Sequence, residues 1–153
     1  MRKKVIISLV AIVILVAATV AITVFSHNLE NSGPKSYDTV EDAEKAAAFP
    51  LAHPDRLGGI PVTGFESNSS MIEAQYGAEN YVRKTLGVSN NSDRDETYSE
   101  FTEQNVGGRS VTLEGRDGLI YLAVWHDNNF AYTVYIAEGV SADEMTEYIE
   151  ATR

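Results

Sequence analysis

The sequence predicts an α+β fold: an N-terminal transmembrane helix, then a helix, an antiparallel sheet of about six or seven strands, and a C-terminal helix packed on one face of the sheet. Two observations predict this order. After an apolar run, the 153-residue chain has a helical period of apolar residues at both ends of its polar part and a period of two in between. Short turn sequences join the successive strands, and short connections imply antiparallel pairing.

Residues 5–25 form the apolar run and contain no charged side chain. At about 1.5 Å per residue, such a helix spans a hydrocarbon core of about 30 Å. Arg2, Lys3 and Lys4 precede the run, so the positive-inside rule puts residues 1–4 in the cytoplasm and the rest of the chain outside. We therefore predict an uncleaved single-pass anchor in the cell membrane. The alternative is a domain secreted after signal-peptide cleavage, but a signal peptide has a shorter apolar core and an A-x-A-like cleavage site.

The charge of the chain is divided unevenly. Three of the 12 basic residues precede the apolar run and all 22 acidic residues follow it, so nine basic residues give the later part a net charge of −13. This part should repel nucleic acid, whose phosphates need basic partners, and anionic membrane surfaces. The chain has no cysteine, which excludes disulfides and a lipoprotein anchor and favours a bacterial origin.

The predicted domain occupies residues 38–153, and residues 26–37 are polar, contain Gly33-Pro34 and are predicted to be a linker. The first helix begins at Asp38 or Thr39, which can cap it, and ends before Pro50. Apolar residues with helical spacing follow the cap at Val40, Ala43 and Ala47.

Seven segments have the alternation or composition of strands. They are residues 61–67, 70–77, 80–87, 97–106, 109–118, 119–126 and 130–137. Residues 80–87 also fit a short helix, but their aromatic and β-branched residues favour a strand. Turns are expected at Asn68-Ser69, at Gly107-Gly108 and at residues 127–129. The last helix begins at Ser141, with Glu144 at the third position after the cap.

The two strands at 119–126 and 130–137 contain the aromatic residues of greatest interest. Strict alternation places Tyr121 and Trp125 on the same face of the first strand, and Tyr132 lies in the second. Both strands are apolar on both faces, which is typical of the middle of a sheet. We expect these residues to belong to the core. The alternative is an aromatic ligand-binding surface made of Tyr121, Trp125 and Tyr132.

Catalytic and metal-binding patterns are weak. The sequence has no metalloprotease, nucleophile-elbow or phosphate-loop motif, so we expect a non-catalytic protein without a cofactor. The loop that contains Asp93, Asp95 and Glu96 offers oxygen ligands of the kind that calcium uses. It lacks the central glycine and the distal glutamate of a calcium loop, and Arg94 lies among the ligands, so a solvated polar loop is the favoured interpretation.

Three stretches resemble a known family: "AAAFPLAHPDRLGG", "VTLEGRDGLIYLAVWHDNNFAYTVYI" and "GVSADEMTEYI". They are similar to an extracytoplasmic domain of unknown function found in membrane-anchored proteins and lipoproteins of Gram-positive bacteria, and to the outer domains of some anti-sigma factors. The shared motifs lie at Phe49-Pro50 and at residues 115–118, 123–125 and 141–145. The resemblance implies a fold and an extracytoplasmic location, and it supplies no catalytic residues. With only four residues before the predicted anchor, no cytoplasmic sigma-binding domain is expected.

These observations together predict a non-catalytic, membrane-anchored extracytoplasmic domain that binds an envelope protein, a peptide or a glycan. An accessory or structural subunit that acts through residues 5–25 is the alternative.

Overall fold

The computed structural model describes residues 33–87 and 98–153. The predicted anchor at 5–25, its cleavage alternative and the calcium-loop candidate with Asp93, Asp95 and Glu96 lie outside these residues. Within the described ranges, no helix combines the length and the apolar character needed to cross a membrane. Pro34–Arg153 form one compact unit, and the α+β fold is confirmed.

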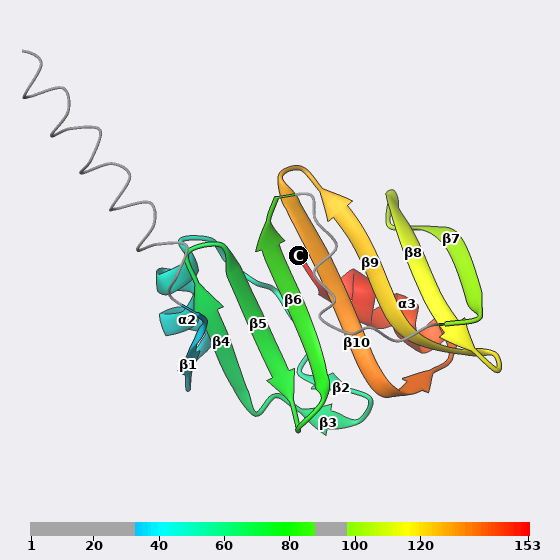
Figure 1. Cartoon of the computed structure of the whole chain (residues 1–153), viewed down its shortest axis with the longest axis horizontal. Helices are drawn as coiled ribbons and strands as arrows, with labels where there is room; N and C mark the ends of the chain where they lie inside the picture. The colour runs from blue at the N-terminus through cyan, green and yellow to red at the C-terminus, as the bar shows by residue number, and fades with distance from the viewer. Residues whose placement is uncertain (1–32, 88–97) are drawn as a thin grey trace, which may run out of the picture. The chain divides into compact units, whose positions relative to one another are not determined.

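One large antiparallel sheet dominates this unit (Figure 1). Its eight strands have the order β1-β4-β5-β6-β10-β9-β8-β7. Their bounds are β1 Lys35–Tyr37, β4 Gly64–Asn68, β5 Met71–Tyr76, β6 Asn80–Leu86, β7 Glu100–Val106, β8 Arg109–Arg116, β9 Leu119–Asp127 and β10 Phe130–Val140. A separate two-stranded sheet pairs β2 (Arg56–Leu57) with β3 (Ile60–Pro61).

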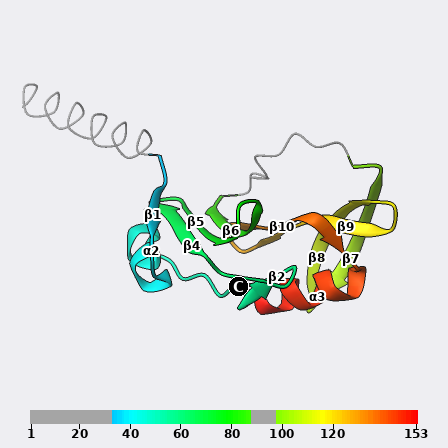
Figure 2. The same cartoon turned by 90° about the horizontal axis from the view of Figure 1, so that it is seen from below.

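Two helices cover the same face of the large sheet (Figure 2). Helix α2 (Val40–Ala47) begins at Thr39, whose hydroxyl accepts a hydrogen bond from Asp42 N at 3.3 Å. Helix α3 (Ala142–Ala151) begins at Ser141, which accepts from Glu144 N at 3.2 Å. Ser141 is therefore confirmed as a cap, and of the two predicted alternatives at the first helix Thr39 is the cap. We call the side of the sheet that carries α2 and α3 the helix face.

Both sides of the sheet contain a buried apolar cluster. On the helix face, Ala43 and Ala47 of α2 and Met145 and Ile149 of α3 join one continuous core with the inward side chains of the strands. On the opposite side a smaller buried cluster contains six residues. These are Tyr81, Tyr98, Tyr121, Leu122, Val124 and Tyr135. We call this side the tyrosine face.

The N-terminal boundary and the number of strands differ from the prediction. Residues 26–37 were expected to be a linker, but Lys35–Tyr37 form β1 and pair with β4 in the register Lys35↔Ser67 to Tyr37↔Phe65. A three-residue strand is too short to have a recognisable period, so pairing with β4 rather than local pattern defines it. With β1 included, the sheet has eight strands instead of the expected six or seven.

A β-bulge corrects the expected facing of Tyr121. The β8–β9 register shifts between Glu114↔Leu122 and Gly115↔Ile120, so Tyr121 is the extra residue. A bulge turns two successive side chains toward one side of a sheet. Tyr121 therefore joins Leu122 on the tyrosine face, whereas Trp125 lies in the core of the helix face.

Candidate ligand-binding site

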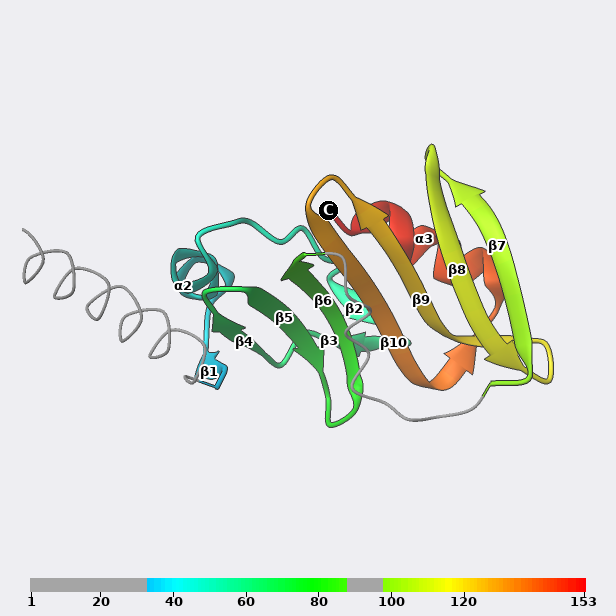
Figure 3. The ribbon, with the colours of Figure 1, turned by 45° about the horizontal axis from the view of Figure 1, so that its top comes forward.

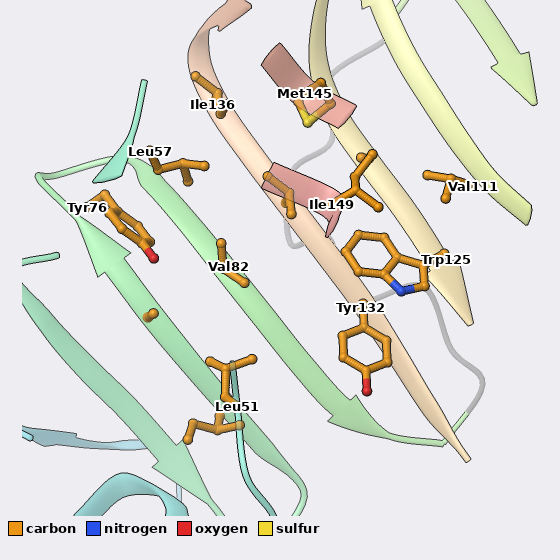
Figure 4. Close-up of a cluster of buried hydrophobic side chains, with 14 of the residues drawn as sticks. Leu51, Leu57, Tyr76, Val82, Val111, Trp125, Tyr132, Ile136, Met145 and Ile149 are labelled. Atoms are coloured by element: carbon orange, nitrogen blue, oxygen red, sulfur yellow. The ribbon is translucent and has the colours of Figure 1, made fainter. Parts of the chain in front are cut away.

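Two of the three aromatic candidates are stacked in the core of the helix face (Figure 4). The rings of Trp125 and Tyr132 lie 5.1 Å apart and nearly parallel, at an angle of 3°. The Arg109 guanidinium lies 5.8 Å from the Trp125 ring and donates to the carbonyls of Ile149 and Thr152 at the end of α3. This arrangement joins β8, β9 and β10 to the last helix.

The third candidate, Tyr121, lies on the tyrosine face. Its ring stacks on Tyr98 with centroids 5.8 Å apart, and the Arg116 guanidinium lies 4.7 Å from the ring centre. The three candidates therefore do not form one common surface. Their role in ligand binding stays a prediction, and the structure directs attention to a different group of residues.

A buried ion pair lies on the tyrosine face between β5 and β6. Glu73 and Arg83 are directly opposite each other in the register. Arg83 Nε donates to Glu73 Oε2 at 2.7 Å, and Arg83 Nη2 lies 2.6 Å from the same oxygen. Only 8% of the Glu73 side chain and 11% of the Arg83 side chain are exposed. Burial raises the pKa of the Glu73 carboxyl, although the attraction of Arg83 opposes this shift.

A pocket of about 300 Å³ opens beside this pair, at the end of the β5–β6 hairpin. The turn residues Gly77 and Ala78 form part of its wall. Its remaining wall is made of side chains that carry polar groups. They are Glu73, Gln75, Glu79, Asn80, Tyr81 and Arg83.

Several of these side chains are held in place by their neighbours. Gln75 Nε2 donates to Glu73 Oε1 at 3.4 Å, and Asn80 Oδ1 accepts from Ala137 N of β10 at 2.9 Å. The Tyr81 ring stacks on Tyr135 at 5.4 Å, and the Arg83 guanidinium lies 4.6 Å from its centre. The wall of the pocket is therefore ordered by contacts within the sheet.

The pocket combines complementary hydrogen-bonding groups. A carboxylate accepts hydrogen bonds, a guanidinium donates them, and the amides of Gln75 and Asn80 contain both kinds of group. Such a set suits a ligand with hydroxyl or amide groups, which also both donate and accept. Orienting polar groups in a concave wall are typical of small-ligand sites.

A second buried charge, Lys84, lies on the helix face of β6. Its ammonium group donates to the Pro50 carbonyl at 2.7 Å. It also lies 4.6 Å from the ring centre of Phe130, 5.3 Å from that of Tyr132 and 5.7 Å from that of Phe49. Burial lowers the pKa of Lys84, while Asp127 and Glu44 act in the opposite direction. These contacts connect the segment after α2 to the centre of the sheet.

The two histidines of the domain occupy separate places. His53 Nδ1 lies 3.1 Å from both the Pro54 carbonyl and the Tyr76 hydroxyl, and its ring packs on Phe65 of the helix-face core. His126 is exposed near the end of β9. Among residues 33–87 and 98–153, no group of three or more histidines and acidic residues is placed to hold a metal ion.

The pocket was not predicted from the sequence. Glu73 and Arg83 are ten positions apart and belong to ordinary alternating strands, so neither forms a motif with its sequence neighbours. The one usable signal was the facing register of the predicted strands at 70–77 and 80–87, which brings the two charges together.

Comparison with known proteins shows no match to a family model, a curated protein or a solved structure.

Proposed function

We propose that this protein is a non-catalytic binding domain, held outside the cell by a single-pass membrane anchor, and that its pocket on the β5–β6 hairpin binds a polar envelope ligand, a glycan or a peptide. The observation that supports this proposal is the pocket built on the buried Glu73–Arg83 pair. The anchor is proposed from residues 5–25 and from the basic residues before them. The resemblance to an extracytoplasmic domain family is in keeping with the same location.

The energetics of the ion pair favour a role in recognition. Removing two charges from water is costly, and an apolar pair of similar volume is often as stable. The raised pKa of Glu73 reflects this cost. A buried pair in the wall of a pocket is therefore better explained by a ligand that uses its fixed donors and acceptors. Because Glu73 is held by both Arg83 and Gln75, it suits a stationary acceptor better than a group that must move a proton.

Calorimetric titration of the full chain in detergent micelles tests the proposal. The probes are soluble peptidoglycan glycan fragments and short uncharged peptides. We expect saturable heat with one of the two classes. The informative variant exchanges the pair, Glu73→Arg with Arg83→Glu, because it keeps an ion pair in the wall and inverts its donors and acceptors. It should fold, at a cost of about 1 kcal/mol because the contact of Arg83 with the Tyr81 ring is lost, and it should lose the ligand.

The matched control is Glu41→Gln on α2, which removes a carboxylate from an exposed position on another element and should bind as the wild type does. Absence of heat with every probe would contradict the proposed site. Wild-type affinity in the exchanged variant would also contradict it, since binding would then depend on other residues.

A further inference from the structure

The two edges of the large sheet are unequal. At one edge, β1 has three residues; at the other, β7 has seven. No strand among the described residues pairs with the outer side of β7 (Figure 3), and its first six residues are exposed. Proteins usually protect a long edge with charged side chains, especially lysine, with proline or with a bulge. Strand β7 contains neither proline nor lysine, and its pairing with β8 is regular, so its only charged side chains are those of Glu100 and Glu103.

The turn after β7 shows which of its backbone groups face outward. Val106 pairs with Arg109 across the two-residue turn Gly107-Gly108, whose φ angles are 58° and 86°. Such a turn is closed by a hydrogen bond between its two flanking residues. Because bonded and non-bonded pairs alternate along an antiparallel ladder, the peptide groups of Phe101, Glu103 and Asn105 point away from β8. These groups are accessible to a further strand.

Phe101 and Glu103 also place an apolar and a charged side chain beside this edge. Phe101 pairs with Glu114, which alternates with core residues of the helix face, so Phe101 and Glu103 are on the tyrosine-face side. Phe101 is 64% exposed, the largest fraction among the exposed large apolar residues of the described chain. An exposed phenylalanine next to outward peptide groups offers apolar contact to an added strand.

Charge decides between two candidate occupants of this edge, a second copy of the chain and a basic strand of another protein. A second copy that pairs along the whole strand in antiparallel orientation would be centred on Glu103, and would set Glu103 opposite the same residue of the partner. Like charges directly opposite each other destabilise a strand pair. The net charge of −13 in the part after residue 25 adds to this repulsion. An incoming strand with a basic residue at the same place would be attracted instead.

We propose that the outer edge of β7 binds an extended, basic segment of a partner protein, which adds a ninth strand to the sheet. Backbone hydrogen bonds with residues 101, 103 and 105 hold the segment, Glu103 selects a lysine or arginine opposite it, and Phe101 packs on an apolar neighbour. Strand addition of this kind combines backbone affinity with side-chain selectivity. The interface is separate from the β5–β6 pocket and does not depend on the function proposed for it.

Fluorescence anisotropy with the full chain in detergent micelles tests the proposal. The probe is a short fluorescein-labelled peptide of alternating lysine and valine, and its counterpart has glutamate in place of lysine. We expect the lysine peptide to bind and the glutamate peptide to bind at least about tenfold more weakly. Glu103→Pro removes one outward N–H without affecting a bond to β8, and should weaken binding of the lysine peptide by about tenfold or more.

A second variant guards against misfolding of the proline variant. Glu103→Lys keeps the backbone intact and should reverse the preference, so that the glutamate peptide binds more tightly than the lysine peptide. Glu41→Lys changes the net charge equally at an exposed site on α2 and should keep the wild-type preference. Exchange of Glu73 and Arg83 should leave peptide binding unchanged, which separates this edge from the pocket.

Three results would overturn the proposal. One is absence of binding of the lysine peptide to the wild type. Another is an unchanged preference in Glu103→Lys together with unchanged affinity in Glu103→Pro. The third is a concentration-dependent dimer that Glu103→Pro abolishes, since that result would assign the edge to a second copy of the chain.

Discussion

At the scale of single residues, Lys84 makes the stability of the domain depend on pH. Its ammonium group is enclosed by Phe49, Phe130 and Tyr132, and burial lowers its pKa from the usual 10.5. Between the lowered pKa and 10.5, the unfolded chain binds more protons than the folded chain. The free energy of unfolding therefore rises with pH across this window. Below the lowered pKa the ammonium group is protonated in both the folded and the unfolded chain, so the loss of stability caused by its burial is complete.

Substitution of Lys84 by methionine tests this dependence. Lys84→Met keeps most of the volume and cannot titrate, so its stability should lack this contribution. From pH 7 toward pH 10, the free energy of unfolding of the wild type should rise relative to that of the variant. The full gain, which is reached only above pH 10.5, is about 1.4 kcal/mol for each pH unit by which the folded pKa lies below its usual value.

Urea unfolding of both proteins at several pH values provides the measurement. Taking the difference between them removes the titration of groups that are shared and independent of Lys84. Two parallel stability curves would show that the ammonium group has the same pKa in both states.

At the scale of elements, the bulge in β9 depends on a glycine of the neighbouring strand. Gly139 of β10 has φ of 68°, and a Cβ at this position would lie 2.9 Å from two atoms of the Tyr121 ring. Tyr121 is the bulged residue, and it stacks on Tyr98. The glycine therefore both permits the left-handed backbone and leaves room for a ring of the tyrosine face.

Comparison of two glycine substitutions separates these effects. Gly118 has φ of 77°, and a Cβ added there would have no other side chain or backbone segment within 4 Å. Gly118→Ala should cost about 1 kcal/mol through backbone strain alone. Gly139→Ala should cost about 1–3 kcal/mol more, because overpacking against Tyr121 is added.

Chemical denaturation of both variants measures the difference. Equal destabilisation by the two substitutions would mean that the Tyr121 ring moves aside without cost. If the ring moves, its stacking on Tyr98 changes, so the tyrosine fluorescence of Gly139→Ala should differ from that of the wild type. The fluorescence of Gly118→Ala should stay as in the wild type.

Local patterns were sufficient to predict most elements but not how they meet. Helix caps at Thr39 and Ser141, the strand at 80–87 and the turn at Gly107-Gly108 are all signalled within a few residues, and all are confirmed. The first hairpin turn is displaced by one residue, since Asn68 pairs with Met71 around Ser69-Ser70. Strand β1 and the bulge at Tyr121 were missed because pairing with neighbouring strands produces them.

The candidate site shows the same limit. The expectation that Tyr121, Trp125 and Tyr132 belong to the core is confirmed, since all three are buried and Trp125 and Tyr132 pack against each other. The pocket depends on Glu73 and Arg83, two common residues that only the β5–β6 register brings together. The proposed site is therefore indicated by a charge that faces an opposite charge on the neighbouring strand.

At the scale of the whole molecule, the distribution of charge predicts how the protein meets a membrane. The three basic residues before the apolar run and the apolar run itself favour insertion. The later part, with a net charge of −13, is repelled by anionic lipids. The apolar run, as the proposed anchor, and the acidic part should therefore make opposite contributions to membrane binding.

Flotation with phosphatidylglycerol-containing vesicles tests this division. We expect the full chain to float with the vesicles at both low and high salt, because insertion of about twenty apolar residues does not depend on charge. A chain that begins at residue 34 should stay in the soluble fraction, with a circular dichroism spectrum that retains the β-sheet signal. High salt should not bring it to the vesicles, because screening removes repulsion without creating attraction. If the shortened chain floated, the domain would have its own membrane-binding surface, and the proposed role of residues 5–25 as the anchor would lose its support.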